Sequence, residues 1–189
     1  MSRRSETNAE FLRARQHEAD HNVPGLIGDL ASEQPLVRSH VARVLARFGS
    51  TEAAPHIAKL ANDPVKTVRL AALVALGELK ASGATQILLK GLDDPVPIVR
   101  MGAADGLADL RDRSAIPKLR EVLSTDRDRE VRFCVAYTLV KLADNEVVTD
   151  LPGVLRAMPW RMRLSSEWKE LKRVGDSHEI PQSSATTRS

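Results

Sequence analysis

Residues 63–79 read DPVKTVRLAALVALGEL, and a similar stretch, DPVPIVRMGAADGLADL, occupies residues 94–110. The two stretches are 31 residues apart, and Val-Arg pairs recur in the same register at residues 37–38, 68–69, 99–100 and, one residue late, 131–132. A unit of about 30 residues cannot bury its apolar positions alone and gains a core only by stacking on its neighbours. The sequence therefore predicts a stack of four units.

Each unit is expected to contain two helices. The first helices are expected near a recurrent proline or its equivalent, at residues 24–31, 53–61, 85–92 and 115–123. The second helices are expected to follow an N-cap whose side chain accepts a hydrogen bond from a backbone N–H, namely Ser32, Asp63, Asp94 and Asp126. Because proline suits the first position of a helix, Pro64 and Pro95 are expected to begin two second helices.

The apolar positions of the second helices fall on one side of a helical wheel, as at Val37, Val41, Val44, Leu45 and Phe48. Only 3% of the residues are aromatic, so the core is expected to consist of Leu, Val, Ile and Ala, which suits closely packed helices. Gly102 and Gly106 lie inside the third unit, and a helical glycine costs about 1 kcal/mol unless close packing uses it. We therefore expect an all-α fold whose third unit distorts most easily.

The unit Asp-Pro-x-x-x-Val-Arg-x-x-Ala-Ala-x-x-Leu resembles the HEAT-like repeat, in particular the short-repeat branch found in phycobilin lyases. Residues 64–79 and 95–110 match it best, and the resemblance spans residues 24–142. It implies a right-handed α-solenoid of HEAT-like two-helix repeats. It also implies that the recurrent aspartates and arginines tie neighbouring repeats together, a structural role for Asp63, Asp94, Asp126, Arg69, Arg100 and Arg132.

The chain divides into four expected parts. Residues 1–22 form an N-terminal capping helix, because Thr7-x-x-Glu10 is a capping-box pattern, and residues 23–144 form four HEAT-like repeats. Residues 145–174 form a degenerate fifth repeat or C-terminal cap. Residues 175–189 are rich in Ser, Thr, Gln and Pro without periodicity and are expected to be a disordered tail.

The net charge of +3 does not come from the repeats. Residues 21–150 contain 17 Lys and Arg and 17 Asp and Glu, residues 1–20 contain four of each, and residues 151–189 contain seven basic and four acidic residues. Nucleic-acid binding usually needs a basic stripe. The neutral repeats therefore disfavour a nucleic-acid partner.

The sharpest local motif is His17-Glu18-Ala19-Asp20-His21, which matches the H-E-x-x-H pattern of zinc enzymes. In that pattern two histidines one helical turn apart bind zinc and the glutamate acts as general base. The motif stands on a polar helix that is expected to be exposed, and no third ligand can be picked out of the sequence. A zinc site at His17 and His21 is therefore a weak alternative, and we expect no catalytic residue and no resident cofactor.

Phycobilin lyases, to which the repeats are similar, chaperone a tetrapyrrole onto a cysteine of another protein. A tetrapyrrole-handling function therefore stays open, on analogy alone. The single cysteine, Cys134, lies beside the core stripe and is expected to be a small packed residue. Binding is expected ahead of catalysis.

Side chains opposite the buried stripe would line the concave surface that second helices form in a stacked solenoid. The residues expected there are Arg43, Arg47, Leu70, Val74, Met101, Phe133 and Tyr137. An exposed apolar strip with a polar border usually marks a partner site. We therefore predict a non-catalytic interaction module or adaptor that binds a segment of another protein there, the alternative being that the chain's own tail or neighbouring repeats cover these residues.

Residues 160–173 place Trp160, Leu164, Trp168 and Leu171 on one stripe beside five basic residues. Such a helix can lie on an anionic membrane or dock into a partner. A terminal repeat must also seal the stack with a polar outer face, and this interpretation is favoured. No stretch approaches the roughly 18 apolar residues of a membrane span, and a single cysteine agrees with a reducing compartment, so a cytoplasmic protein is expected.

Overall fold

The computed structural model describes residues 3–142 and the single positions 169 and 173. Over this part of the chain the fold is all-α, and it begins with α1 (Arg3–Ala19). Four helix pairs follow: α2 (Val23–Asp29) with α3 (Pro35–Arg47), α4 (Ala54–Leu60) with α5 (Lys66–Glu78), α6 (Ala84–Gly91) with α7 (Pro97–Leu110), and α8 (Ile116–Thr125) with α9 (Arg129–Lys141). Short 3-10 helices, η1 (Thr51–Ala53) and η2 (Arg113–Ala115), lead into α4 and α8.

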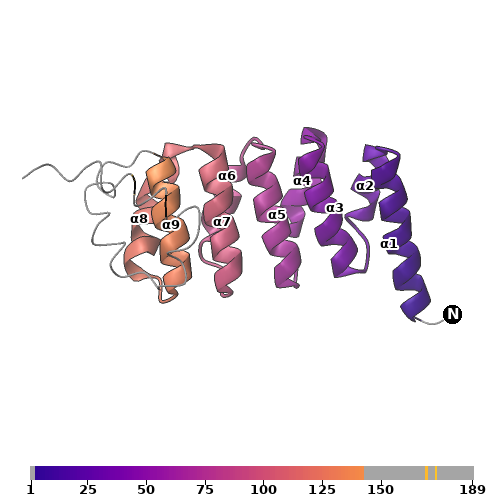
Figure 1. Ribbon diagram of the computed structural model, residues 1–189, viewed down its shortest axis with the longest axis horizontal. Helices are drawn as coiled ribbons and strands as arrows, with labels where there is room; N and C mark the ends of the chain where they lie inside the picture. Colours follow the sequence, from indigo (N-terminus) through magenta and orange to yellow (C-terminus); the bar gives the residue numbers. More distant parts are fainter. Residues whose placement is uncertain (1–2, 143–168, 170–172, 174–189) are drawn as a thin grey trace, which may run out of the picture.

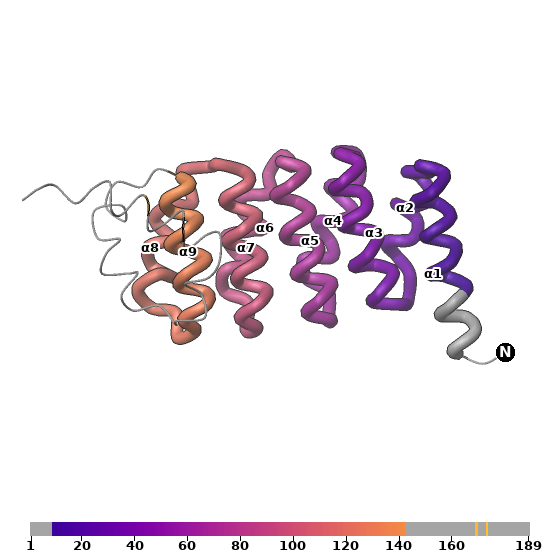
Figure 2. The backbone as a smooth tube through the Cα atoms, viewed as in Figure 1, coloured from indigo at the N-terminus to yellow at the C-terminus, as the bar shows by residue number. Residues whose placement is uncertain are grey.

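The helix pairs succeed one another along the long axis of the molecule, from α1 at one end to α8 and α9 at the other (Figures 1 and 2). The second helices, α3, α5, α7 and α9, pack directly against one another, and α1 extends their row beyond α3. Consecutive first helices, α2, α4, α6 and α8, make far fewer contacts in the described part of the chain. The second-helix row is therefore the tighter side of the stack.

The core lies between the two rows of helices and repeats with the sequence. The valines of the four Val-Arg pairs are all inaccessible to solvent, at Val37, Val68, Val99 and Val131. Each first helix also places a fully buried aliphatic residue in the same register, at Leu26, Ile57, Leu88 and Leu119. The predicted stripe therefore forms one continuous core through the described repeats.

The turns before the second helices differ from the predicted N-caps. The helices begin two residues later than expected, after Gln34, Val65, Val96 and Asp128, and Pro35 and Pro97 rather than Pro64 and Pro95 occupy a first turn. The Asp63 and Asp94 side chains instead accept a hydrogen bond from the N–H two residues on, at 2.9 Å in each case. A side chain that bonds its own backbone two residues ahead stabilises a turn, and the helix starts only where that turn ends.

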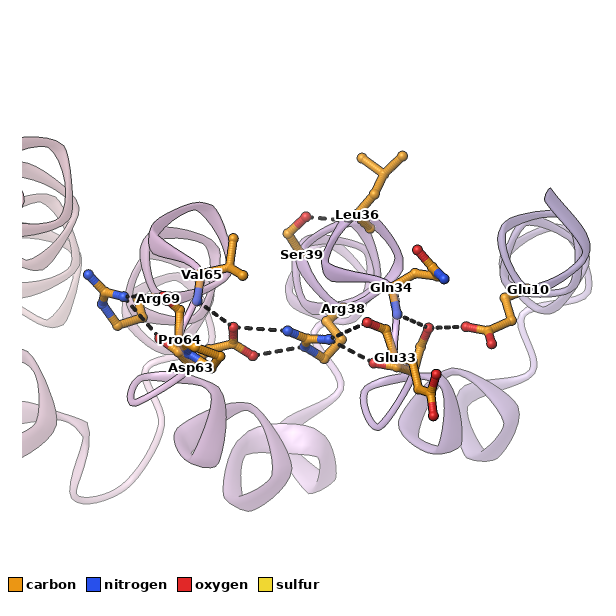
Figure 3. A network of polar contacts seen from close by, with 11 residues as sticks. Glu10, Glu33, Gln34, Leu36, Arg38, Ser39, Asp63, Pro64, Val65 and Arg69 are labelled. Atoms are coloured by element: carbon orange, nitrogen blue, oxygen red, sulfur yellow. Dashed lines mark hydrogen bonds and ion pairs between the residues drawn. The ribbon is translucent and has the colours of Figure 1, made fainter. Parts of the chain in front are cut away.

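A row of arginine–aspartate pairs runs from repeat to repeat along the stack. Each arginine lies near the start of a second helix, and its aspartate lies in the turn before the next second helix. Nε and Nη2 of Arg38 donate to the two carboxylate oxygens of Asp63 at 2.8 and 2.9 Å, as Figure 3 shows. Arg69 holds Asp94, and Arg100 holds Asp126, with the same two-pronged geometry. The remaining nitrogen of each arginine, Nη1, donates to the backbone oxygen of residue 32, 63 or 94.

Each of these arginines thus fastens the turn of its own repeat to the turn of the next one. This geometry confirms the tying role that the resemblance implied for the Arg69–Asp94 and Arg100–Asp126 pairs. The first repeat has Ser32 in place of the aspartate, and its hydroxyl donates to Glu10 of α1. In the last described repeat Nη1 of Arg132 donates to the backbone oxygen of Asp126 at 2.6 Å.

Acid is expected to weaken the stack through these aspartates. Burial alone would raise the pKa of Asp94, but hydrogen bonds from Arg69 and the Val96 N–H outweigh it, so its pKa lies below the ordinary 3.8. The pKa of Asp126 is lowered against burial in the same way, by Arg100 and the Asp128 N–H. A carboxyl group whose pKa is lower in the folded chain than in the unfolded one stabilises the fold above about pH 4, and this contribution is lost as the pH falls through the folded-state pKa.

We therefore expect the stability difference between the wild type and Asp94→Asn to be full at pH 6 and to shrink steadily below about pH 4. Urea unfolding followed by circular dichroism at several pH values measures this difference. A difference that stays constant from pH 6 to pH 2.5 would show that the Asp94 carboxylate is not stabilised by folding.

Glycines bring α5 and α7 into backbone contact. A β-carbon built on Gly77 would overlap the Cα of Gly106 and lie 2.7 Å from its carbonyl oxygen. One built on Gly106 would lie 2.9 Å from the carbonyl oxygen of Leu73 and 2.7 Å from the side chain of Leu88. The close packing of α5 on α7 therefore requires glycine at position 106, so Gly106 does not simply destabilise its helix.

The fifth repeat or cap expected at residues 145–174 and the disordered tail expected at 175–189 lie outside the described residues, apart from positions 169 and 173. Among the helices that the structure describes, none combines the length and apolar character needed to cross a bilayer.

Candidate functional site: the open face of the second helices

The residues predicted to form a partner site differ in their exposure. Arg43 and Arg47 are exposed, whereas four of the apolar residues are half-buried, namely Leu70, Val74, Met101 and Tyr137. Phe133 is buried, with 3% of its surface exposed. Phe133 therefore offers a partner little area, and the accessible apolar surface must come from other residues.

Two exposed aliphatic residues enlarge this face, and the sequence prediction did not include them. Leu36 is 60% exposed and Ile98 is 49% exposed, and they occupy the same position in the first and third repeats. Each directly precedes a buried valine in its helix, so its side chain points to the flank of the buried stripe and not into the core. In Figure 3 the Leu36 side chain points away from the arginine–aspartate row.

We define the second-helix face as Leu36, Leu70, Val74, Ile98, Met101 and Tyr137. Leu70 lies across Gly102 of α7, where a β-carbon would overlap its Cδ1. Leu70 and Met101 also pack against the core, so their exposed sides are held in place. The core therefore supports the centre of the face at Leu70 and Met101.

Charged groups border the face at both ends. At the α1 end Arg43 is exposed, and Arg47 Nη2 donates to Glu18 Oε1 at 2.8 Å. At the α9 end the Lys141 ammonium lies 5.0 Å from the centre of the Tyr137 ring, within the range of a cation–π interaction. An apolar centre with a charged border has the anatomy of a protein-binding surface.

The H-E-x-x-H motif holds α1 onto the stack. His17 Nδ1 lies 2.8 Å from Asp29 Oδ2, and Arg13 also pairs with this buried carboxylate. α1 ends at Ala19, and His21 has a positive φ of 51° and stacks on Phe48 with ring centres 4.7 Å apart. The two histidines are therefore not one helical turn apart on one face, as zinc binding by this motif requires.

Glu18, the general base of the zinc interpretation, joins α1 to α3. Its carboxylate lies 2.9 Å from Nε2 of His40 and also accepts the bond from Arg47. Burial alone would raise the pKa of Glu18, but the contacts with His40, Arg15 and Arg47 outweigh it and lower the pKa. In the described part of the chain no three His, Cys, Asp or Glu side chains are grouped so that they could hold a metal ion.

Glu18→Ala is expected to loosen α1 without unfolding the repeats. Removing a carboxylate that makes two side-chain hydrogen bonds typically costs about 1–3 kcal/mol, so amides of α1 should exchange with deuterium about tenfold faster or more. Mass spectrometry of peptic fragments measures this exchange. Gln16→Ala is the control, because Gln16 is exposed and bonds Asp20 of its own segment; equal exchange in both variants would mean that Glu18 does not dock α1.

The paired layers and the recurrent arginine–aspartate row define a class of α-helical repeat protein. The sequence pattern of HEAT repeats matches residues 23–108 and 85–168. The chain therefore belongs to the HEAT-repeat family, whose members are scaffolds that generally bind other proteins.

Two solved structures with TM-scores above 0.5 agree on the fold, and a third aligns less closely. The complex of CpcE and CpcF of phycocyanin lyase from Nostoc sp. PCC7120 aligns with a TM-score of 0.54 and 17% identity, covering 82% of this chain and 94% of that one. An engineered protein aligns with a TM-score of 0.55 and 19% identity, covering 82% and 77%. Human deoxyhypusine hydroxylase in complex with glycerol has a TM-score of 0.46 and 16% identity, covering 90% and 79%. No curated protein matches the chain.

Proposed function

We propose that this protein is a non-catalytic adaptor that binds a segment of another protein on the second-helix face. The observation that carries the proposal is the exposure of Leu36 and Ile98 in register beside half-buried apolar residues of the same face. Exposed apolar surface with a charged border is typical of interaction sites. Solenoid proteins commonly bind their partners on the surface that one row of their helices forms.

The arrangement suits an elongated partner segment. Equivalent positions in successive repeats form rows that run along the stack. Leu36 and Ile98 belong to one row, with Thr67 between them, and Leu70 and Met101 belong to the neighbouring row. A helix or an extended strand can place a side chain on each repeat in turn. The charged border would then set the orientation of the segment.

The test is capture from native lysate with a variant that leaves the core intact. Leu36→Glu/Ile98→Glu changes the two most exposed residues of the face, so its circular dichroism spectrum and melting should match the wild type. The control, His56→Glu/Ser124→Glu, adds the same charge at exposed positions on the first helices α4 and α8.

We expect the wild type and the control to retain the same protein. Its recovery with the Leu36→Glu/Ile98→Glu variant should fall at least about tenfold, as when central apolar contacts of an interface are lost. Equal recovery from all three, or no specific capture by any of them, would contradict the proposal.

The tetrapyrrole-handling alternative has only the likeness of fold in its favour, and fold alone does not assign a function. Visible absorbance that remains with the protein after incubation with a bilin and gel filtration would reveal such binding. We propose the adaptor function because it rests on exposed residues of this chain.

A further inference from the structure

A groove lies between the first helices α4 and α6, on the opposite layer from the second-helix face. One part encloses about 840 Å³ near the C-terminal ends of the two helices, and a second part of about 540 Å³ lies toward their N-terminal ends. The two parts share Ala58 and Ile87 in their walls, so they adjoin at these residues. Helices of seven and eight residues give the groove a length of about 10–12 Å.

The groove exists because α4 carries alanine where other repeats carry larger residues. Ala54, Ala58 and Ala61 line it along α4. The equivalent residues are Val23, Ile27 and Leu30 in α2, Thr85, Leu89 and Leu92 in α6, and Ile116, Arg120 and Leu123 in α8. The floor is formed by Leu73 and Leu76 of α5, and the other wall carries Ile87.

The charge around this apolar floor is not balanced. Two of the three lining carboxylates have an arginine of their own, Asp63 with Arg38 and Asp94 with Arg69, and Asp93 shares Lys118 with Glu121. Three lining lysines, Lys59, Lys80 and Lys90, are exposed and have no carboxylate partner among the described residues. Lys90 Nζ donates to Oδ1 of the neutral Asn62 at 3.3 Å.

We propose that this groove binds a short acidic segment of a partner protein, with one or two aliphatic side chains on the floor and carboxylates beside the lysines. Lys59 and Lys90 are the same position of consecutive repeats and stand at one end of the groove, and Lys80 stands at the other. The segment is therefore aliphatic in the middle and acidic at both ends. It occupies a surface separate from the second-helix face.

Two synthetic peptides test the charge requirement. Acetyl-Glu-Glu-Leu-Leu-Ile-Glu-Glu-amide and acetyl-Lys-Lys-Leu-Leu-Ile-Lys-Lys-amide share their aliphatic centre and differ in the sign of their ends. Methyl-labelled full-length protein is titrated with each up to 1 mM and followed by NMR. We expect the acidic peptide to shift the methyl signals of Ala58, Ala61 and Ile87 and to leave those of Leu36 and Ile98 in place.

Two variants separate groove binding from non-specific attraction. Ala58→Ile/Ala61→Leu fills the groove with the side chains that α2 carries at these positions, so it should fold, and we expect at least tenfold weaker binding of the acidic peptide. Lys59→Glu/Lys90→Glu should weaken it by about tenfold and favour the basic peptide instead, since each rim charge contributes a few-fold.

Equal shifts with both peptides, no shifts up to 1 mM, or unchanged binding by the filled variant would each overturn the proposal. Analytical ultracentrifugation of the protein alone tests whether a second copy of this chain fills the groove instead. A dimer in the wild type that the filled variant loses would show that a second copy of this chain occupies the groove, and the proposal of a separate acidic partner would be wrong.

Discussion

Gly77→Ala is expected to destabilise the protein by about 3 kcal/mol, at the upper end of the usual cost of overpacking a core. The new methyl group would meet the backbone of Gly106, with the carbonyl oxygen at 2.7 Å. A flexible side chain can rotate away from such a contact, but backbone cannot, so α5 and α7 must move apart. Because this helix pair lies in the middle of the stack, the shift would disturb both halves.

Urea unfolding followed by circular dichroism measures the effect, and Gly28→Ala provides the control. Gly28 is also helical, in α2, but a β-carbon there would have no neighbour within 4 Å. Alanine favours a helix over glycine by about 1 kcal/mol, so this variant should be as stable as the wild type or slightly more stable. Equal stability of the two variants would show that the α5–α7 contact does not need glycine.

Arg69→Met is expected to cost about 3 kcal/mol, because it leaves the largely buried Asp94 carboxylate without the cation that neutralises it. The side chains of Arg69 and Asp94 are only 13% and 11% exposed. The substitution also removes the bond from Nη1 to the backbone oxygen of Asp63, which ties the turn of the same repeat. The loss should therefore exceed that of an ordinary surface ion pair, which is about 0–1 kcal/mol.

Arg47→Met is the matched control, since Arg47 also pairs with a carboxylate, that of Glu18, but is 63% exposed. Chemical unfolding of both variants should separate them by at least about 1.5 kcal/mol. A loss from Arg69→Met no greater than that from Arg47→Met would mean that the arginine–aspartate row contributes little to the stack.

The period of 31 residues was enough to predict the fold, because in a repeat protein the same residues that recur in sequence also meet in the core. Valines of the Val-Arg pairs are buried in all four described repeats, as the wheel predicted. The expected start of the second helices was wrong by two residues, because Asp63 and Asp94 bond the backbone ahead of the helix instead of capping it. Sequence shows that an aspartate precedes a helix, but not which backbone N–H it meets.

The candidate functional surfaces were harder to predict from the sequence. The wheel identified Leu70 and Met101 but passed over Leu36 and Ile98, since a small rotation of a helix decides whether a residue beside the stripe is covered. The H-E-x-x-H motif shows only the spacing of its residues along one helix. Its side chains contact Asp29 and His40 of neighbouring helices, which the motif does not predict. The signal for the α4–α6 groove was the row of alanines at 54, 58 and 61, which becomes visible only when the repeats are aligned.

The claim that the second-helix face receives a partner is tested most directly by site-specific photo-crosslinking. Ile98, or His56 on the first-helix layer, is replaced by p-benzoylphenylalanine, and the protein is irradiated in native lysate. We expect position 98 to form one dominant crosslink to another protein and position 56 to form none. A partner that crosslinks equally from both positions, or from His56 alone, would contradict it.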